Sequence, residues 1–398
     1  MTQMPAITVI IPTRERADVL EKALSTVVAQ NYERLQIIVS DNCSNDGTSD
    51  VVAGFRDPRI RYVRTQSRLS MADNYETALA HAPASWVGFM GDDDGLCIQA
   101  IPRLAQIITE TGVQAVRSRT VTFDWPGAHG RNHGNLIVPM GRGYEIRKSA
   151  QWLSRVMQGL APYAELPMAY NGGFVHKDVF DAIKARGGRY FRSSSPDVYS
   201  AVAVASVADR YAFSHEPLSI NGTSTHSIGT AFHRGQGNSA AAKRFFSEGN
   251  IPLHSDVPLD LDGSYPLSLH ALVLEAYLQS STLRDPESVD FSNQLAIMLA
   301  LERSHRRSVQ EWGAVFADHH GLSLQRAERR AALLRGPLQA RSMWLKATRA
   351  ANSIMLDDAT LPLNDVYQCS LAVAIVRGYR SRVTSLFRAF RHRRRVTG

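Results

Sequence analysis

The segment from residue 86 to residue 95, WVGFMGDDDG, decides the fold, because an apolar strand ends there in three consecutive aspartates. Three similar apolar runs precede it, at residues 7–11, 35–39 and 60–63. Segments with helical spacing separate these runs, at residues 16–30, from Asp46 onward and at 71–81. Strands that are apolar on both faces and alternate with helices indicate a parallel sheet covered on both sides. We therefore predict an α/β fold for about the first 100 residues.

The rest of the chain shows three further patterns. Residues 113–230 mix strands, predicted at 115–123, 173–176 and 211–214, with helices, predicted at 149–158 and 196–208. Residues 231–263 are rich in Gly, Ser, Asn, Asp and Pro, which is typical of a linker or a wrap-around segment. From residue 264 onward the pattern is helical, with helices predicted at 264–279, 291–304, 309–319, 324–334, 343–355 and 366–395.

The charge of the chain is concentrated at one end. The 398 residues carry 45 Lys and Arg against 37 Asp and Glu, a formal net charge of +8. Residues 377–398 hold eight arginines and no acid, so residues 1–376 are formally neutral. A hydrophobic fraction of 44% excludes wholesale disorder, and no apolar run approaches the roughly 20 residues of a membrane span. With three scattered cysteines and no secretory signal, we expect a reducing cytosol.

Polar side chains follow each predicted strand of the first half. In parallel sheets of this kind, ligands bind beyond the carboxyl ends of the strands. The residues at those ends are Pro12, Thr13, Arg14, Glu15, Asp41, Arg68, Asp92, Asp93 and Asp94. We therefore predict the binding site at this edge of the sheet.

The three consecutive aspartates indicate a cation site. Packed carboxylates raise each other's pKa unless a positive charge lies between them. A hard divalent cation, Mg²⁺ or Mn²⁺, supplies that charge and commonly bridges substrate phosphates, so a nucleotide diphosphate is the expected partner. The alternatives are a solvated acidic turn or a helix cap for the aspartates, and a turn residue for Asp41.

Four ordered motifs carry a family resemblance: ITVIIPT at residues 7–13, IIVSDNCSNDGT at 37–48, Asn74 with Ala78, and WVGFMGDDD at 86–94. With them the chain resembles the family 2 glycosyltransferases, continuously over about the first 100 residues and more weakly through about residue 230. The resemblance implies a GT-A fold, which is Rossmann-like with a mostly parallel central sheet and helices on both faces, followed by an α-helical C-terminal region.

The resemblance and the pattern together divide the chain. Residues 1–230 are expected to form the GT-A domain, with a nucleotide-sugar-binding half at 1–110 and an acceptor-binding half at 111–230. Residues 231–263 would then link it to a helical region at 264–398, which ends in a basic amphipathic helix.

The resemblance also implies roles at the sheet edge. The expected donor contacts are Pro12, Thr13, Arg14, Glu15, Asp41, Arg68, Asp92 and Asp93. In the family, the first loop holds the nucleobase and an aspartate at the position of Asp41 reads the base or ribose. Some members place a base-contacting arginine where Arg68 lies.

The metal motif departs from the usual family pattern. Many members have Asp-x-Asp-Asp, whereas this chain has Gly91 before Asp92, Asp93 and Asp94. One register makes Asp94 the metal ligand with Asp93 beside it, and the other makes Asp92 and Asp94 the pair. Asp94 is therefore the metal ligand predicted in both registers.

Inverting members of the family need a carboxylate general base roughly 100 residues after the metal motif. Asp197 fits, because Pro196 can start a helix and places Asp197 in its first turn. The alternative is an acid that interacts with the helix dipole. Asp178 and Asp181 are further candidates, although their sequence is more typical of a helix start.

Two loops carry further candidates. A late loop of GT-A enzymes sometimes returns a histidine to the metal or the diphosphate, and His226 is placed for this role or is an ordinary surface histidine. The run Asn171-Gly172-Gly173 either lets the backbone approach the acceptor or forms a turn into a strand.

The last predicted helix is basic and amphipathic, with apolar residues every three or four positions among the arginines of 377–398. This pattern indicates an anchor on an anionic membrane surface, with packing on the other helices as the alternative. Nucleic acid is disfavoured as a partner, because the aromatic residues are not interleaved for stacking and the rest of the chain is neutral. We expect a cytoplasmic protein, peripheral on the inner membrane face, with self-association through the helical region left open.

These expectations combine into one activity. The chain is predicted to be a metal-dependent inverting glycosyltransferase that moves a sugar from a nucleotide-diphosphate donor, a UDP-sugar, to a hydroxyl acceptor in bacterial surface glycan or glycolipid synthesis. The alternative from another class is a catalytically silent GT-A scaffold that binds partners. A nucleotidyltransferase is less favoured, because such enzymes usually begin with a glycine-rich loop and residues 12–16 contain no glycine.

Overall fold

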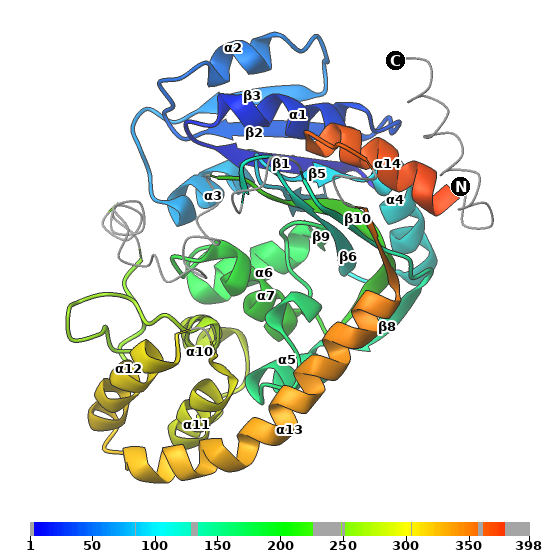
Figure 1. Cartoon of the computed structure of the whole chain (residues 1–398). Helices are drawn as coiled ribbons and strands as arrows, with labels where there is room; N and C mark the ends of the chain where they lie inside the picture. Colours follow the sequence, from blue (N-terminus) through cyan, green and yellow to red (C-terminus); the bar gives the residue numbers. More distant parts are fainter. Residues whose placement is uncertain are drawn as a thin grey trace.

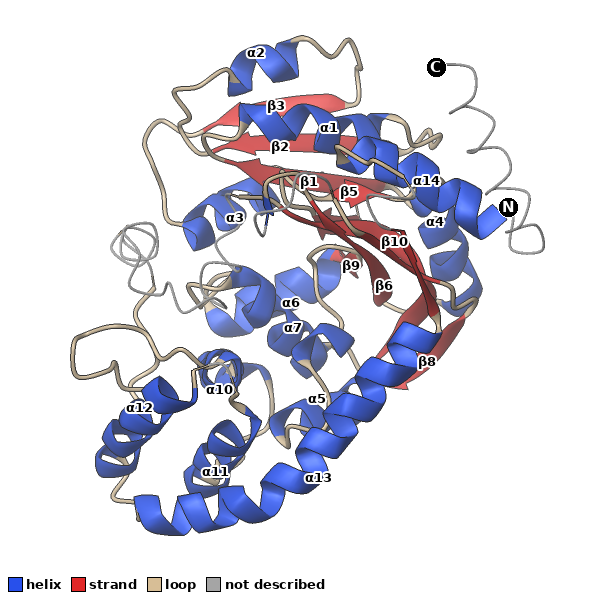
Figure 2. Ribbon diagram, in the orientation of Figure 1, coloured by secondary structure: helices blue, strands red, loops and turns tan. Residues whose placement is uncertain are grey.

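The structure is a computed structural model that describes residues 4–83, 85–128, 134–225, 248, 251–303, 305–356 and 361–378. An 11-stranded sheet forms its upper part and a layer of helices its lower part (Figure 1). Helices lie on both faces of the sheet, as Figure 2 shows by colour. The predicted α/β class and the helical C-terminal region are therefore both confirmed.

The first half of the sheet is parallel, as the sequence predicted. Its strands are β1 (Ile7–Thr13), β2 (Leu35–Asp41), β3 (Ile60–Arg64) and β4 (Trp86–Phe89), in the order β4-β1-β2-β3. The helices between them are α1 (Ala17–Val28), α2 (Thr48–Ala53) and α3 (Met71–Ala80). Every strand pair in this half runs parallel.

The apolar strands are explained by burial on both faces. Ile10 of β1 belongs to one core cluster with Ala78 and Leu79 of α3. Its neighbour Ile11 belongs to a second cluster with Leu20 of α1, because successive side chains of a strand point to opposite faces. Two helical layers therefore require strands without alternating polar residues.

The second half makes the sheet mixed. Its strands are β5 (Gly95–Leu96), β6 (Ala115–Asp124), β7 (Leu136–Pro139), β8 (Tyr144–Lys148), β9 (Gly173–His176), β10 (Arg210–Thr223) and β11 (Ser353–Leu356). Only β10 with β6 is parallel here, and β9 joins the two halves by running antiparallel to both β4 and β6. The predicted parallel arrangement thus describes the first half and one pair of the second.

The helices of this half carry the predicted acceptor side. They are α4 (Ala100–Thr111), α5 (Ser149–Met157), the 3₁₀ turn η2 (Tyr163–Glu165), α6 (Lys177–Gly187) and α7 (Pro196–Val207). Helix α7 is apolar around nearly its whole circumference, because it packs against α5, α6 and α10 (Leu269–Gln279). Pro196 stands at its first turn, as predicted.

The helical layer contains α10, the 3₁₀ turn η3 (Ser281–Leu283), α11 (Phe291–Leu301), α12 (Arg306–His319) and α13 (Leu324–Ala351). The two helices predicted at 324–334 and 343–355 are one helix, which continues through Pro337. The prediction was also wrong at the end of this segment, where residues 353–356 form strand β11. This strand pairs antiparallel with β7 and so returns the chain to the sheet.

After β11 the chain stays with the first half of the molecule. Helix α14 (Val366–Gly378) packs on α1 and β5, and Val366, Cys369, Val373 and Val376 are buried in the core cluster of α1. The helix predicted at 366–395 therefore begins as core, while residues 379–398 lie outside the described residues. No helix in the described part of the chain is long and apolar enough to cross a membrane.

Candidate active site

A cavity of about 180 Å³ lies where the sequence predicted a ligand, beyond the carboxyl ends of β1, β2 and β4. Its wall combines loop residues after these strands with side chains from α3 and the second half. The lining residues are Pro12, Thr13, Arg14, Arg16, Asn42, Met71, Asn74, Tyr75, Gly91, Asp92, Asp93, Tyr170 and Glu248. Three of the predicted donor-loop residues and two of the three aspartates thus meet at one cavity.

Asp94 differs from its two neighbours, because it does not line this cavity. Its Oδ1 accepts the Gly222 N–H at 2.8 Å, and its Oδ2 accepts the Gly91 N–H at 3.0 Å and the Tyr170 hydroxyl at 3.1 Å. Burial, followed by the charge of Asp93, raises the pKa of Asp94 to about 8. The carboxylate therefore ties the loop after β4 to β10.

Asp92 and Asp93 face the cavity and are held by other groups. Asp93 accepts the Ser224 hydroxyl at 2.6 Å, and its carbonyl accepts the Trp125 indole N–H at 2.8 Å. Burial raises the pKa of Asp92, although the Arg16 charge opposes this.

Arg16 is the positive partner of these carboxylates, and no role was predicted for it beyond its place in the first loop. Its Nη1 lies 2.8 Å from Asp92 Oδ1 and 3.8 Å from Asp93 Oδ2. Burial opposes the charge of Arg16, but the two aspartates raise its pKa overall. The aspartate run therefore already has one counter-charge from the protein itself.

The residues at the cavity fit a hard divalent cation. Carboxylate oxygens are its preferred ligands, and Mg²⁺ is commonly held by one or two carboxylates while substrate phosphates and waters complete the shell. Asp92 and Asp93 supply two such groups. No cluster of three or more His, Cys, Asp or Glu ligands occurs among the described residues. His226, predicted as a further ligand, lies outside them.

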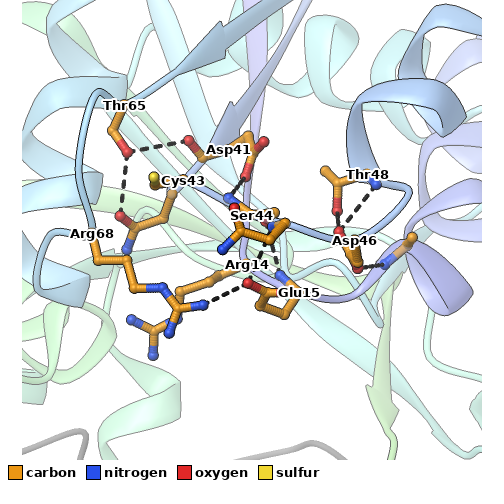
Figure 3. A network of polar contacts seen from close by, with 12 residues as sticks. Arg14, Glu15, Asp41, Cys43, Ser44, Asp46, Thr48, Thr65 and Arg68 are labelled. Atoms are coloured by element: carbon orange, nitrogen blue, oxygen red, sulfur yellow. Dashed lines mark hydrogen bonds and ion pairs between the residues drawn. The ribbon is translucent and has the colours of Figure 1, made fainter.

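Asp41 is buried at the end of β2, one residue from the cavity wall. Its Oδ1 accepts the Ser44 N–H at 2.9 Å (Figure 3). Its Oδ2 accepts the Tyr62 hydroxyl and lies 3.5 Å from Arg64 Nε. The next residue, Asn42, lines the cavity and bonds the Leu69 backbone with both ends of its amide, at 2.8 Å each.

Glu15 and Arg68 meet each other at the rim, as Figure 3 shows. Arg68 Nη2 lies 2.6 Å from Glu15 Oε1, which also accepts the Asn45 N–H at 3.1 Å. Glu15 and Cys43 both have a φ of 55°, a left-handed conformation that is uncommon for such residues. Arg14, which lines the cavity, forms an ion pair of 2.6 Å with Glu248.

The predicted base, Asp197, lies in the first turn of α7 and accepts the Tyr163 hydroxyl at 3.2 Å. Burial raises its pKa. Two tyrosines of the cavity wall, Tyr75 and Tyr170, connect it with the aspartate loop. Burial raises the pKa of each, and the charges of both Asp197 and Asp94 raise it further. The structure thus brings Asp197 near the same cavity.

The other candidates have structural contacts instead. On α6, Asp178 pairs with His176 at 3.3 Å, and Asp181 accepts the Tyr190 hydroxyl at 3.4 Å. A Cβ on Gly173 would lie 1.8 Å from the Met168 carbonyl oxygen, and one on Gly172 would lie 2.5 Å from Ser219 Oγ. These glycines therefore allow close packing of the turn into β9.

The sequence reasoning missed Arg16, Tyr75, Tyr163 and Tyr170. Arg16 follows the first strand at the predicted edge, so its position was a usable signal. The tyrosines reach the site through packing of segments that are distant in sequence, and no local pattern marks them.

The fold places the chain among the α/β proteins that bind ligands at a sheet edge, and comparison with known proteins gives the family of this domain. Residues 8–161 match the family model Glycosyl transferase family 2. This segment is therefore a family 2 glycosyltransferase domain, as the resemblance implied.

Curated relatives match part of their length. Over 110 residues the chain is 37% identical to GalNAc(5)-diNAcBac-PP-undecaprenol beta-1,3-glucosyltransferase of Campylobacter jejuni, a match that covers 27% of this chain and 36% of that protein. Over 88 residues it is 27% identical to UDP-Glc:alpha-D-GlcNAc-diphosphoundecaprenol beta-1,3-glucosyltransferase WfgD of Escherichia coli, covering 22% and 35%. The matched segments thus span about a third of each relative.

Among solved structures, TarS 1-349 of S. aureus in complex with UDP-GlcNAc is similar over 83% of this chain and 92% of that chain. Its sequence identity is 13% and its TM-score is 0.49.

Proposed function

We propose that this protein is a glycosyltransferase that moves a sugar from a nucleotide-diphosphate donor to a hydroxyl acceptor in bacterial glycan synthesis. The observation that supports this most is the cavity at the sheet edge of the family 2 domain, where Asp92 and Asp93 face Arg14 and Arg16. Carboxylates for a cation and guanidiniums for phosphate are the groups that a nucleotide diphosphate requires. We propose a UDP-sugar as the donor.

The cation, Mn²⁺ or Mg²⁺, is proposed to bind Asp92 and Asp93, with Asp94 holding their loop in place. When bound, the cation neutralises the negative charge that develops on the leaving diphosphate. Pro12, Thr13 and Asn42 are proposed to contact the nucleoside, with Asp41 next to Asn42 in the chain and Arg68 at the rim.

Asp197 is proposed to take the proton of the acceptor hydroxyl as that oxygen attacks the anomeric carbon. Attack opposite the leaving diphosphate inverts the configuration at that carbon. The raised pKa of Asp197 favours proton uptake by this carboxylate at neutral pH. Tyr163, which donates to the carboxylate, orients it from η2.

Calorimetry with UDP and Mn²⁺, followed by a donor screen that measures nucleotide release, tests the proposal. Asp93→Asn should abolish binding of UDP–Mn²⁺, and Asp197→Asn should abolish transfer while binding remains. Asp178→Asn, on the surface of α6, is the matched control and should behave as the unsubstituted protein. Absence of UDP binding in the presence of Mn²⁺ would contradict the proposal and favour a silent scaffold.

The acceptor is proposed to be a glycan linked to a lipid diphosphate, because the names of two relatives specify such acceptors. A membrane-bound acceptor gives the basic C-terminal segment a role. Arg377 is described and bonds the carbonyls of Pro139 and Gly141, while the other seven arginines of 377–398 follow it outside the described residues.

Removal of residues 379–398 should therefore release the protein from anionic vesicles, because each basic residue near such a surface contributes about 1 kcal/mol. Nucleotide release from the donor should be unchanged, since α14 is retained. Vesicle sedimentation measures the first effect. Retained vesicle binding, or unfolding of the shortened chain, would exclude the anchor.

A further inference from the structure

A second cavity, of about 450 Å³, shares no residue with the candidate active site. It lies between the second half of the sheet, η2 and the end of α13, which Figure 2 shows running from the helical layer towards the sheet. Arginines from three parts of the chain line it: Arg117 and Arg119 of β6, Arg142 after β7, and Arg349 of α13. His215 also lines the cavity, and its imidazole ring can donate a hydrogen bond.

The cavity carries an excess of positive charge. Its only acidic lining residue in the described chain is Glu165, which bonds Arg119 and Arg349 together with the buried Arg147. Arg147 is balanced separately by Glu145 at 2.6 Å. Four guanidiniums therefore line the cavity against one carboxylate.

Arg117 shows that this charge is not fully compensated. It is buried and donates hydrogen bonds to three backbone carbonyls, those of Asn171 at 2.6 Å, Ala164 at 2.9 Å and Tyr170 at 3.2 Å. Burial lowers its pKa to about 10, although Glu165 opposes the shift. An anion in the cavity would supply the charge that these groups lack.

The guanidiniums are held in place before any ligand arrives. Glu165 fixes Arg349 at 2.7 Å and Arg147 at 2.9 Å. Arg119 lies over the Phe213 ring at 4.8 Å from its centroid. Guanidiniums that are fixed in this way bind phosphate with little further loss of side-chain entropy.

The cavity is coupled to the candidate active site through η2. Tyr163 at one end of this turn donates to Asp197, and Glu165 at the other end holds the arginines. Arg117 bonds the carbonyl of Tyr170, whose hydroxyl bonds Asp94. A ligand in the cavity therefore touches the segment that supports the proposed base.

A third cavity lies next to the second one, because Arg349 lines both. It measures about 300 Å³ and lies between the loop after α5 and helices α10, α11 and α13. The surface of its wall is mainly apolar, with Leu160, Leu269, Val273 and Leu345 among the lining residues. The charged residues Glu302, Arg341 and Lys346 line it as well. A basic cavity beside a mainly apolar one suits a ligand with a phosphate head and a hydrocarbon chain.

We propose that the arginine-lined cavity binds the diphosphate of a lipid-linked acceptor, with the first part of the hydrocarbon chain in the adjoining, mainly apolar cavity. This assignment rests on the proposed transferase function for the identity of the ligand. The diphosphate would stand on the side of η2 remote from the cation site, so the acceptor and the donor would each have an anion site of their own.

Calorimetry of the full chain with inorganic pyrophosphate and with farnesyl diphosphate tests this. EDTA is present throughout, because the donor site is proposed to need a cation. The double variant Arg142→Gln/Arg349→Gln should bind both probes at least about tenfold more weakly, since two charge-assisted contacts are lost. Arg142→Gln alone, which removes no ion pair with an acid, should show part of the loss without an effect on folding.

Two controls separate the two cavities. Arg329→Gln, an exposed arginine on α13 outside both cavities, should bind the probes unchanged. Asp93→Asn should also bind them unchanged, whereas UDP–Mn²⁺ binding should be lost in Asp93→Asn and kept in the double variant. If the unsubstituted protein does not bind UDP–Mn²⁺, the proposed function is contradicted. The pyrophosphate measurement still tests the arginine-lined cavity in that case.

Unchanged probe affinity in the double variant, or loss of it in Asp93→Asn, would overturn the site. Farnesyl diphosphate should bind at least about tenfold more tightly than pyrophosphate, because burial of hydrocarbon adds about 25 cal/mol per Å². Equal affinities would overturn the lipid assignment and indicate a free diphosphate.

Discussion

At the scale of single residues, the three consecutive aspartates have separate tasks. Asp92 and Asp93 face the cavity, while Asp94 accepts two backbone N–H groups and a hydroxyl. The sequence predicted the set and its place at the sheet edge. It favoured Asp94 as metal ligand, and that assignment stays a prediction. Gly222, which engages Asp94, lies 128 positions away, so no local pattern could reveal the bond.

Asp94→Ala should lower the free energy of unfolding by about 2–4 kcal/mol, because buried donors lose their acceptor. Asp93→Asn should change the free energy of unfolding by less than about 1 kcal/mol, since an amide oxygen can still accept from Ser224. Urea unfolding followed by circular dichroism measures both. Equal losses in the two variants would contradict the separate tasks.

Arg16 is expected to compete with a cation for the carboxylates of Asp92 and Asp93. Arg16→Gln should therefore bind Mn²⁺ at least about tenfold more tightly in the absence of nucleotide, because a positive charge within 4 Å of Asp92 is removed. Titration followed by electron paramagnetic resonance reads free Mn²⁺. Arg34→Gln, at a surface position away from the cavity, is the control. Weaker binding in Arg16→Gln would show that the guanidinium supports the cation instead.

At the scale of elements, the turn η2 joins two features that the sequence did not connect. Tyr163→Phe removes the hydroxyl that lowers the pKa of Asp197, so that pKa should rise. A base acts only when deprotonated, and the acidic limb of the pH–rate profile should therefore move to higher pH by about one unit. Steady-state rates between pH 5 and pH 9 measure the shift.

Tyr32→Phe provides the matched control for that experiment, because its hydroxyl bonds the Pro5 carbonyl far from η2. Its profile should coincide with that of the unsubstituted protein. An unshifted acidic limb in Tyr163→Phe, with a normal control, would show that Asp197 is not the group that titrates.

Elements with strong local patterns were predicted well, and those fixed by distant partners were not. The strands β1, β2, β3 and β4 are apolar runs closed by polar loops, and each appears where predicted. Strand β11 has four residues and exists because it pairs with β7, so its neighbours in sequence predicted a helix. Pro337 lies at an exposed position inside α13 despite its helix-breaking tendency.

At the scale of the whole molecule, one buried carboxyl links the helical layer to the segment before α7. Glu275 of α10 accepts the Ser193 hydroxyl at 2.6 Å, and burial raises its pKa to about 7. A carboxyl whose pKa is higher in the folded chain binds its proton more tightly there. Its contribution to stability is therefore complete below about pH 4.5 and is lost as the pH rises through about 7.

Between pH 5 and pH 8 this group should lower the free energy of unfolding by about 3 kcal/mol. Glu275→Gln should remove that dependence, because the amide does not titrate. Glu311→Gln, at an exposed position of α12, should keep it. Urea unfolding at both pH values measures the difference. An unchanged pH dependence in Glu275→Gln would assign the effect to another group.

The late pairing of β11 with β7 also determines how long the sheet stays incomplete during translation. Strand β11, the partner of β7, is synthesised more than 200 residues after β7. At about 5–20 residues per second, the interval between the two strands lasts about 10–40 s. Over that interval the nascent chain presents an unpaired strand edge, together with the apolar surface of α1 that α14 later covers. The half-finished sheet therefore stays exposed until β11 and α14, at residues 353–378, have been synthesised.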